Sequence, residues 1–355
     1  MKKVLITVTA TIFIFLLSGI TNYGFSEGWI ERKVVDKTFD ISSNARLVVD
    51  HEFGEVRCSN WNKNEIHVVA TVRVNTDNDS KAQKIIDKVI VNVKGSNSKV
   101  ETECSLNSKG GKDKDFKISI DLDIMMPKSV SVEMENNFGV IYIEAVEGSA
   151  VVSCEYGTLE IGSLLNKENA IDVEFGSAKI RNVNACEVEA SYSKLSIGDA
   201  NNMSIESDYS DVEINSVNEL SIEVDGGQLS IDEVDYIELE ANMSDIKIGV
   251  LSEAISAEVE YGSLEIGLID KGFKSVEMDN SYGSVNLNFS KDVSYNLQAQ
   301  SVYGSVNYPE NNAEIKVHKH DNGNLVISAI VGSDSNPKSK VIIETEYGAF
   351  NLKTK

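Results

Sequence analysis

Four cysteines and two closely spaced histidines are the residues whose types could support redox, nucleophilic or metal chemistry. The cysteines are Cys58, Cys104, Cys154 and Cys186. An even number of cysteines permits disulfides in an exported protein. Cys154 and Cys186, however, occupy repeat positions that Val, Ala or Met fill elsewhere, so buried free thiols fit equally well. None of the four has the spacing of a metal site.

His318 and His320 alternate along a predicted strand and would lie on one face of it, where two imidazoles can bind a metal ion. Two histidines beside a predicted hairpin are a weak metal signal, and the pattern favours exposed polar strand residues. No group of residues has the arrangement of a catalytic site. The sequence therefore predicts no catalytic residue, no metal site and no cofactor.

Acidic residues dominate the charge of the chain, with 56 Asp and Glu against 33 Lys and Arg and a net charge of −23. This balance disfavours binding to nucleic acid and to anionic membranes. Several acidic residues precede a recurring Gly or Ser by two positions: Glu155, Glu174, Asp208, Asp225 and Glu260, which we call the corner carboxylates. Carboxylates of adjacent coils can bind calcium. A solvated acidic face is favoured, because Ser191 and Asn242 interrupt the series and the nonapeptide of calcium-binding β-rolls is missing.

The corner carboxylates each precede a copy of one repeated phrase, which in most copies reads an aromatic residue, a Gly or Ser, any residue, an aliphatic, any residue and an aliphatic. The Gly or Ser positions are Gly54, Gly139, Gly157, Gly176, Ser193, Ser210, Gly227, Ser244, Gly262, Gly283, Gly304 and Gly348. The regular copies recur every 17 to 21 residues, which is typical of a solenoid. Apolar residues alternate with polar ones within each copy, as in half-buried strands. The sequence therefore predicts an all-β fold, a parallel β-helix or β-solenoid.

The inward phase of the alternation slips by one residue at each Gly or Ser. A corner explains this slip, and we expect Gly to supply the unusual backbone angles of the bend. Stacked coils would place equivalent residues in ladders. One is an aliphatic column four residues after the corner, and the other is the aromatic ladder: Phe53, Phe138, Tyr156, Phe175, Tyr192, Tyr209, Tyr261, Tyr282, Tyr303 and Tyr347. We expect both ladders to pack in the core.

The remaining segments flank the regular repeat. Residues 1–26 have two lysines before an apolar run and predict a signal peptide, or an N-terminal anchor if the segment is not cleaved. Residues 27–130 predict an irregular β region continuous with the solenoid, with one short helix whose capping box begins at Ser80. The regular coils span 131–308. Residues 309–340 predict an inserted hairpin and loop, centred on Asp321-Asn322-Gly323, and residues 341–355 form the final coil.

In these residues and repeats the chain resembles a bacterial family of exported adhesin-like proteins, also called toastrack domains. The likeness covers about residues 38–354. It rests on Phe39-Asp40, Leu47-Val48-Val49 and Phe53-Gly54, on the segment 80–88, on the turn 126–130 and on the repeated coils. The resemblance implies an envelope-associated β-solenoid and supplies no catalytic residues. Several coils here carry Ser in place of the family's Gly.

Three functions are compatible with this sequence. The favoured one is a non-enzymatic exported solenoid that binds an unknown envelope or surface partner, protein or glycan, in the periplasm, at the cell surface or after secretion. A self-assembling envelope scaffold is the first alternative. A carbohydrate-active β-helix enzyme is the second, but evenly spread carboxylates and short coils disfavour it. If a binding face lies on irregular segments, the 309–340 insertion and the 105–115 loop are the expected places. A membrane contact is expected only through an uncleaved N-terminal segment.

Overall fold

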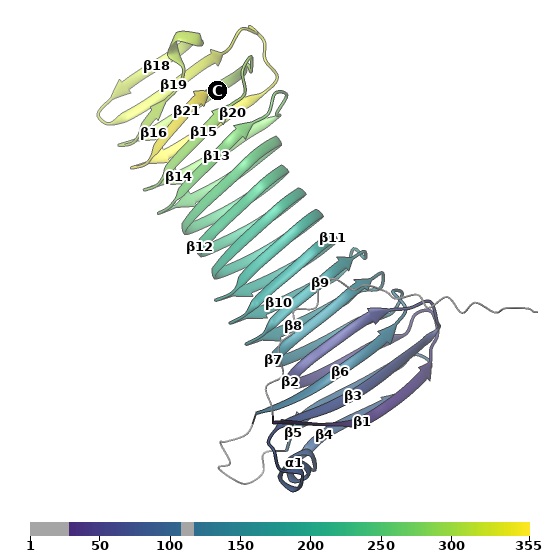
Figure 1. Ribbon diagram of the computed structural model, residues 1–355. Coiled ribbons are helices and arrows are strands. Elements are labelled where there is room, and N and C mark those ends of the chain that lie inside the picture. The colour runs from purple at the N-terminus through teal and green to yellow at the C-terminus, as the bar shows by residue number, and fades with distance from the viewer. Residues whose placement is uncertain (1–27, 108–116) are drawn as a thin grey trace, which may run out of the picture.

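The computed structural model describes residues 28–107 and 117–355, so the predicted signal segment lies outside the described residues, as does most of the 105–115 loop. The described chain forms a long rod of stacked strands (Figure 1). The helix α1 (Asp79–Ile86) is the one α-helix in these two ranges. The predicted all-β solenoid is confirmed. No helix in the described ranges has the length and apolar character needed to cross a bilayer.

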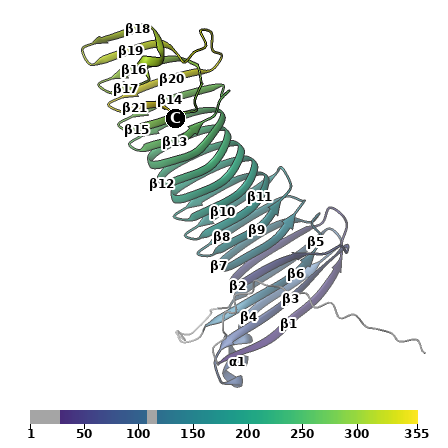
Figure 2. The same ribbon diagram turned by 45° about the horizontal axis from the view of Figure 1, so that its top comes forward.

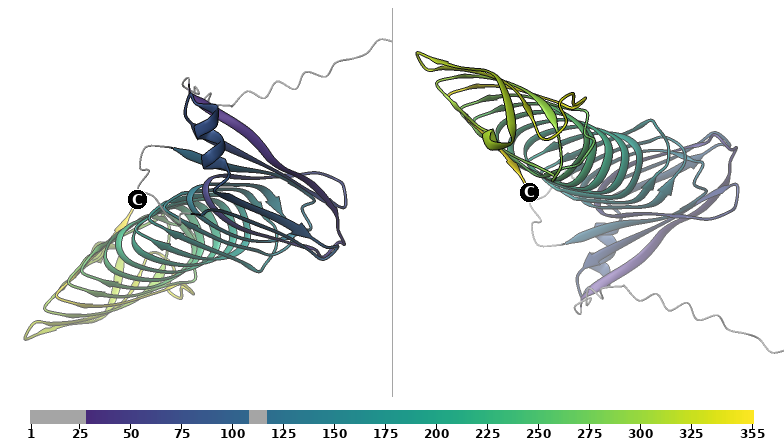
Figure 3. Two further views of the ribbon diagram at one scale, coloured as in Figure 1. Left: turned by 90° about the horizontal axis from the view of Figure 1, so that it is seen from below. Right: turned by 90° about the horizontal axis from the view of Figure 1, so that it is seen from above.

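The middle of the rod consists of parallel coils that lie over one another when viewed from either end (Figure 3). Equivalent residues pair in register, so that Ile180 lies beside Ile197 and Val188 beside Ile205. The strands of this part are β7 (Ser131–Val146), β8 (Ala150–Glu155), β9 (Thr158–Leu164), β10 (Asn169–Glu174), β11 (Ser177–Ser191), β12 (Lys194–Glu260), β13 (Ser263–Ile269), β14 (Ser275–Ser281) and β15 (Ser284–Phe289). β12 winds through several coils without interruption.

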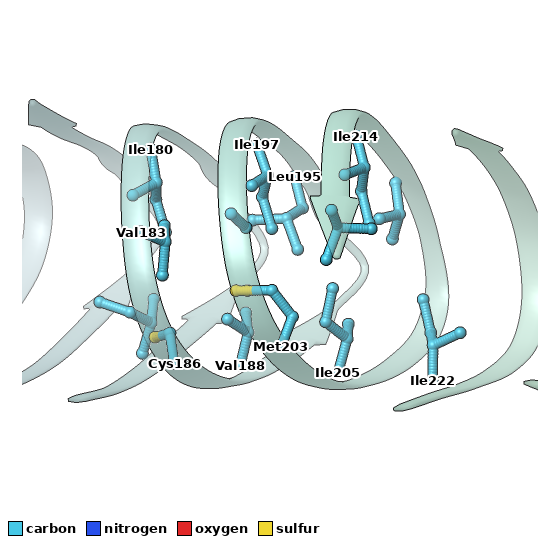
Figure 4. Packing of buried hydrophobic residues seen from close by; sticks show 14 of the residues in the cluster. Ile180, Val183, Cys186, Val188, Leu195, Ile197, Met203, Ile205, Ile214 and Ile222 are labelled. Carbon is cyan, nitrogen blue, oxygen red and sulfur yellow. The ribbon is translucent and has the colours of Figure 1, made fainter. Parts of the chain in front are cut away.

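The aliphatic column of the repeat fills the interior of the coils. Ile180, Ile197 and Ile214 follow one another along one inner wall, facing an opposite row that includes Val188 and Ile205 (Figure 4). All are buried. Burial of each such side chain contributes about 1.5–3 kcal/mol, which explains why β-branched and aliphatic residues recur at this position. The expectation that this column packs in the core is correct.

The N-terminal end of the rod is a mixed sheet. β2 pairs in parallel with β7, and its other edge pairs in parallel with β5 and β6. Beyond them the direction changes, because β3 runs antiparallel to β6, β1 antiparallel to β3, and β4 antiparallel to β5. These strands are β1 (Trp29–Asp40), β2 (Arg46–Asn60), β3 (Glu65–Asn75), β4 (Val89–Gly95), β5 (Lys99–Leu106) and β6 (Ile118–Met126). The N-cap of α1 is Asn78, which accepts a hydrogen bond from the Lys81 amide, and not the expected Ser80.

The C-terminal end folds back on itself. β20 (Lys340–Glu346) pairs in parallel with β14 on one side and with β16 (Tyr295–Val302) on the other. β21 (Ala349–Thr354) lies in the same way between β15 and β17 (Ser305–Asn307). The coil that ends the sequence is therefore inserted between two earlier coils and is not the end of the stack.

A hairpin covers this end of the rod (Figure 2). β18 (Ala313–Asp321) and β19 (Asn324–Val331) are antiparallel, and β19 also runs antiparallel to β16. The 3-10 turn η1 (Glu310–Asn312) precedes them. The hairpin turn has φ of 48° at Asn322 and 84° at Gly323, as expected for the tight two-residue turn that Asn-Gly favours.

Candidate functional site

The corner of each coil has its unusual backbone angle at the aromatic residue. From Phe53 to Tyr347 these residues have φ between 48° and 62°, the left-handed region that side chains other than Gly rarely adopt. Most of the following glycines have ordinary angles. The expectation that Gly supplies the unusual angle is therefore wrong for most coils.

The Gly is needed because successive coils approach closely at the corner. A Cβ on Gly139 would lie 2.0 Å from the carbonyl oxygen of Gly54, and one on Gly176 would lie 2.4 Å from that of Gly157. Where Ser replaces Gly, its hydroxyl is buried and bonded to the backbone. The Ser193 Oγ donates to the carbonyl oxygens of Ser191, at 2.7 Å, and Val173, at 3.1 Å.

The aromatic side chains point outward from the corners and stack face to face along one edge of the rod. Neighbouring ring centroids are 5.0–5.6 Å apart, with interplanar angles of 5–11°. The order in space is Phe53, Phe138, Tyr156, Phe175, Tyr192, Tyr209, then, after a break, Tyr261, Tyr282, Tyr347 and Tyr303. In the break, the ladder position is occupied by Gly226 and Met243.

The aromatic ladder lies on the surface. Nine of its ten residues are 43–63% exposed, and Phe53 is partly buried. The expectation that it packs in the core is wrong. The physical reason is the left-handed backbone of the aromatic residue, which directs its side chain away from the interior of the coil while the next residue stays buried or close to the neighbouring coil. Because the ring faces cover one another, the surface that they offer to a partner consists mainly of ring edges and tyrosine hydroxyls.

The corner carboxylates flank this ladder. Partial burial in the stack raises the pKa of Tyr282, and the neighbouring Tyr261 and Glu346 act in the same direction. A tyrosine phenol is protonated at neutral pH even without this shift, so its hydroxyl can donate a hydrogen bond. In the two described ranges, no group of three or more His, Cys, Asp or Glu side chains is placed to hold a metal ion.

A second line of carboxylates runs beside the first and was missed in the sequence. It lies four residues before ten of the twelve Gly or Ser positions, and we call it the acidic column: Asp50, Glu135, Asp172, Glu189, Glu206, Glu223, Glu240, Glu258, Asp279 and Glu344. In-register pairing places many of them side by side, as for Glu189 with Glu206 and Glu258 with Asp279. A shallow hollow of about 370 Å³ follows part of this column. Counting charge at every repeat position, rather than next to the Gly alone, reveals it.

The four cysteines are buried free thiols. Burial raises the pKa of Cys58 to about 12 and that of Cys154 to about 11, so neither is a thiolate near neutral pH. The partners of Cys58 in the stack are Ile124 and Ile143, so no second sulfur lies beside it in those strands. Disulfides and buried free thiols were both compatible with the sequence, and the structure has buried free thiols.

The interior also holds one histidine, His51. Its Nδ1 lies 2.6 Å from Asn136 Oδ1 and its Nε2 lies 2.7 Å from the carbonyl oxygen of Ile120. Both His51 and Asn136 are buried, so no substrate reaches this pair from solvent. It is a buried polar pair within the core, in which Asn136 Nδ2 has no hydrogen-bond partner among the described residues. By contrast, His318 and His320 are exposed on β18 and face Ile327 and Leu325 across the hairpin.

The model of the Toastrack DUF4097 family matches residues 45–353. The chain belongs to this family. No protein with a curated description matches this Toastrack chain.

Solved structures of low identity are similar to it. One, described as a "putative cell adhesion protein" of Clostridium sporogenes, is 10% identical, covers 91% of this chain and 100% of its own, and has a TM-score of 0.18. A "putative adhesin" of Bacteroides fragilis is 11% identical over 93% of this chain and 98% of its own, with a TM-score of 0.27. A "putative adhesin" of Parabacteroides merdae is 15% identical, covers 73% of this chain and 96% of its own, and has a TM-score of 0.31.

Proposed function

We propose that this Toastrack chain is an exported, non-enzymatic, adhesin-like rod that binds an envelope or surface partner, protein or glycan, along its aromatic ladder. The observation that carries the proposal is the exposure of this ladder: one edge of the rod presents a column of aromatic rings to solvent. Contiguous exposed apolar surface on a soluble protein marks an interaction site. Tyrosine, with an apolar ring and a polar hydroxyl, is the residue type enriched at such sites.

A purely structural role accounts less well for the ladder. Each stacked pair contributes about 0.5–1.5 kcal/mol, whereas each left-handed backbone costs about 1–2 kcal/mol. Stacking therefore roughly offsets the strain of the corner and leaves little net gain. Strained residues that persist in a fold point to a use beyond stability.

The arrangement of carboxylates supports a binding role over sugar cleavage. Glycosidases need two carboxylates about 5–9.5 Å apart across a bound sugar. Here the corner carboxylates and the acidic column run as continuous lines along an open face, so no pair is set apart from its neighbours in the described chain. The arrangement resembles a charged surface more than a catalytic pair.

The ends of the rod argue against the scaffold alternative. The edge strand β1 carries Arg32, Lys33 and Lys37 and is mostly exposed. At the other end, β18 carries Lys316 and Lys319 on an exposed strand. Charged side chains on an edge strand oppose pairing with a further chain, so end-to-end growth is disfavoured at both ends.

Protease shaving of intact cells tests the proposed location. Cells are treated with protease and probed for the solenoid, with a cytoplasmic protein as the lysis control. Cleavage or release of the solenoid while the control stays intact is expected. If the solenoid is degraded only after the envelope is broken, adhesion at the surface is contradicted and a partner within the envelope takes its place.

A further inference from the structure

The acidic column is interrupted at β8, near the N-terminal end of the regular coils (Figure 1), where Ser153 takes the place of a carboxylate. Glu135 lies in register on the coil before Ser153, and Asp172 lies in register on the coil after it. Asp50 and Glu189 continue the column beyond them on either side. All four acidic residues are exposed, and none of them forms an ion pair within the two described ranges. The break in the column is therefore flanked on both sides by carboxylates whose charge no described basic residue neutralises.

An open hollow of about 460 Å³ lies over this break. Its floor is the row of outward side chains two residues upstream of the acidic column, which pair in register: Val48, Glu133, Val151, Ala170 and Glu187. Val151, at the centre, is 52% exposed, and the Glu133 carboxylate is paired with Arg46 at 3.0 Å. Farther along the rod the same row is polar: Ser204, Ser221, Glu238, Ser256 and Glu277. We call the space over Val48, Val151 and Ala170 the valine hollow.

The spacing of the flanking carboxylates matches one face of an α-helix. Glu135 and Asp172 are two coils apart, which is about 9.6 Å at the usual distance between neighbouring strands. Residues i and i+7 of a helix lie on nearly the same face, about 10.5 Å apart, with residues i+3 and i+4 between them. In an extended segment the side chains of one face are about 6.8 Å apart, so no pair of them matches these two carboxylates. The valine hollow therefore fits a helix along the rod axis, with a basic residue on each side of an apolar one.

We propose that the valine hollow docks a basic amphipathic helix of a partner protein. An apolar side chain at the centre of the helix contacts Val151 and Ala170, as apolar anchors do when helices bind in grooves. Lys or Arg residues at i and i+7 donate charge-assisted hydrogen bonds to Glu135 and Asp172, and these bonds fix the register of the helix. The apolar floor distinguishes this site from the rest of the acidic column, which attracts cations without selecting among them. The site lies on the strands before the corner, so the inference goes beyond the proposed role of the aromatic ladder and does not depend on it.

Two labelled, helix-stabilised peptides of the same composition test the proposal. In the first, two lysines seven residues apart lie on one face with a leucine between them. In the second, the leucine is exchanged with an alanine on the opposite face, so that general attraction to the acidic rod is the same. Fluorescence anisotropy with the purified full chain measures both affinities. We expect the first peptide to bind about tenfold more tightly, which corresponds to about 1.4 kcal/mol. Equal affinities would overturn the proposal.

Val151→Ser replaces the centre of the apolar floor with the residue that several other coils carry in this row. We expect this variant to lose the preference for the first peptide while keeping the weak attraction to both. The matched control is Val140→Ser, which changes another exposed valine that lies after the corner and outside the hollow, so the preference should remain. An unchanged preference in Val151→Ser would overturn the assignment of the apolar floor.

Asp172→Asn tests the register of the helix and leaves the apolar floor in place. We expect the affinity of the first peptide to fall about threefold, as for the loss of one exposed ion pair. Asp211→Asn is the matched control, because it lowers the net negative charge of the rod by the same amount at an exposed position outside the hollow. Its effect on the first peptide should be smaller. Equal losses in the two variants would overturn the placement of the helix between Glu135 and Asp172.

Discussion

Tyr282 stacks on Tyr347, with ring centroids 5.2 Å apart and an interplanar angle of 11°, although the chain passes through a further coil and a hairpin between them. Tyr347 then stacks on Tyr303 at 5.5 Å. The ladder therefore follows the spatial order of the coils and not the order of the sequence. The C-terminal coil enters the stack where its ring continues the ladder and its strands complete the parallel pairing.

Removing a ring from the middle of the ladder separates stacking from backbone strain. Tyr192 has φ of 50° and stacks on Phe175 and Tyr209. Tyr192→Ala should lower the free energy of unfolding by about 1–3 kcal/mol, because two stacked pairs are lost and the left-handed angle remains. Tyr192→Gly should be the more stable of the two by about 1 kcal/mol, because Gly adopts this angle without strain. Urea unfolding measures both. An Ala variant at least as stable as the Gly variant would show that the corner is unstrained.

The close approach of coils at the corner is tested by Gly139→Ala. The new Cβ would lie 2.0 Å from a backbone oxygen that cannot move aside without breaking the coil. We expect a loss of more than about 2 kcal/mol in unfolding free energy. Gly272→Ala is the control, because no atom lies within 4 Å of its Cβ position although φ is 95°. Its loss should be about 1 kcal/mol, from strain alone. Equal losses would contradict the clash.

The carboxylates of the acidic column should repel one another between adjacent coils. Glu223 lies between two glutamates at equivalent positions of adjacent coils, and like charges directly opposite one another in a sheet are destabilising. Glu223→Gln should raise the unfolding free energy by about 0.2–1 kcal/mol at low salt. The gain should shrink at about 0.5 M NaCl, where the screening length falls below the distance between coils. A gain that does not change with salt would point to a cause other than charge.

The buried thiols should make the stability of the fold decrease at alkaline pH. Burial raises the pKa of Cys58 to about 12, whereas a thiol in the unfolded chain has a pKa of about 8.5. The folded protein therefore binds more protons than the unfolded chain between these values, so its stability is complete below about pH 8.5 and falls toward pH 12.

Urea unfolding of the wild type and of Cys58→Ala at pH 8 and pH 10.5 measures this dependence. The stability lost by the wild type between the two pH values should be larger than that lost by the variant. Equal losses in the two proteins would show that Cys58 does not contribute.

The fold could be predicted from the sequence because the repeat encodes it twice. Alternating apolar residues such as Leu195 and Ile197 indicate strands, and the fixed spacing indicates stacked coils. The spatial position of the last coil could not be predicted, because Val341 and Ile343 have the pattern of any coil and fit between β14 and β16 as well as at the end. The α1 boundary shifted because Asn78 and Ser80 are both good N-caps.

The position of the aromatic ladder was predicted correctly as a column and wrongly as core. The recurrence of these aromatic residues predicts that they form a column. Whether their side chains point into or out of the coil depends on the backbone angle at residues such as Tyr156, which no pattern of hydrophobicity shows. Tyrosine at most of these positions, with a hydroxyl that needs a partner or water, was the signal that favoured the surface. The charges beside the Gly do not reveal the acidic column, because its carboxylates stand two residues further upstream in each coil.

A partner that covers the aromatic ladder would shield its tyrosines from solvent. Tyrosine nitration followed by mass spectrometry tests it on the purified chain and on the chain in its native envelope. In the purified chain, Tyr192, Tyr209 and Tyr261 should react, while Tyr295, which is 1% exposed, should not. In the envelope these three should become protected, while Tyr236, which lies outside the ladder and is partly exposed, should react as before. Ladder tyrosines that react equally in both states would contradict a partner on this edge.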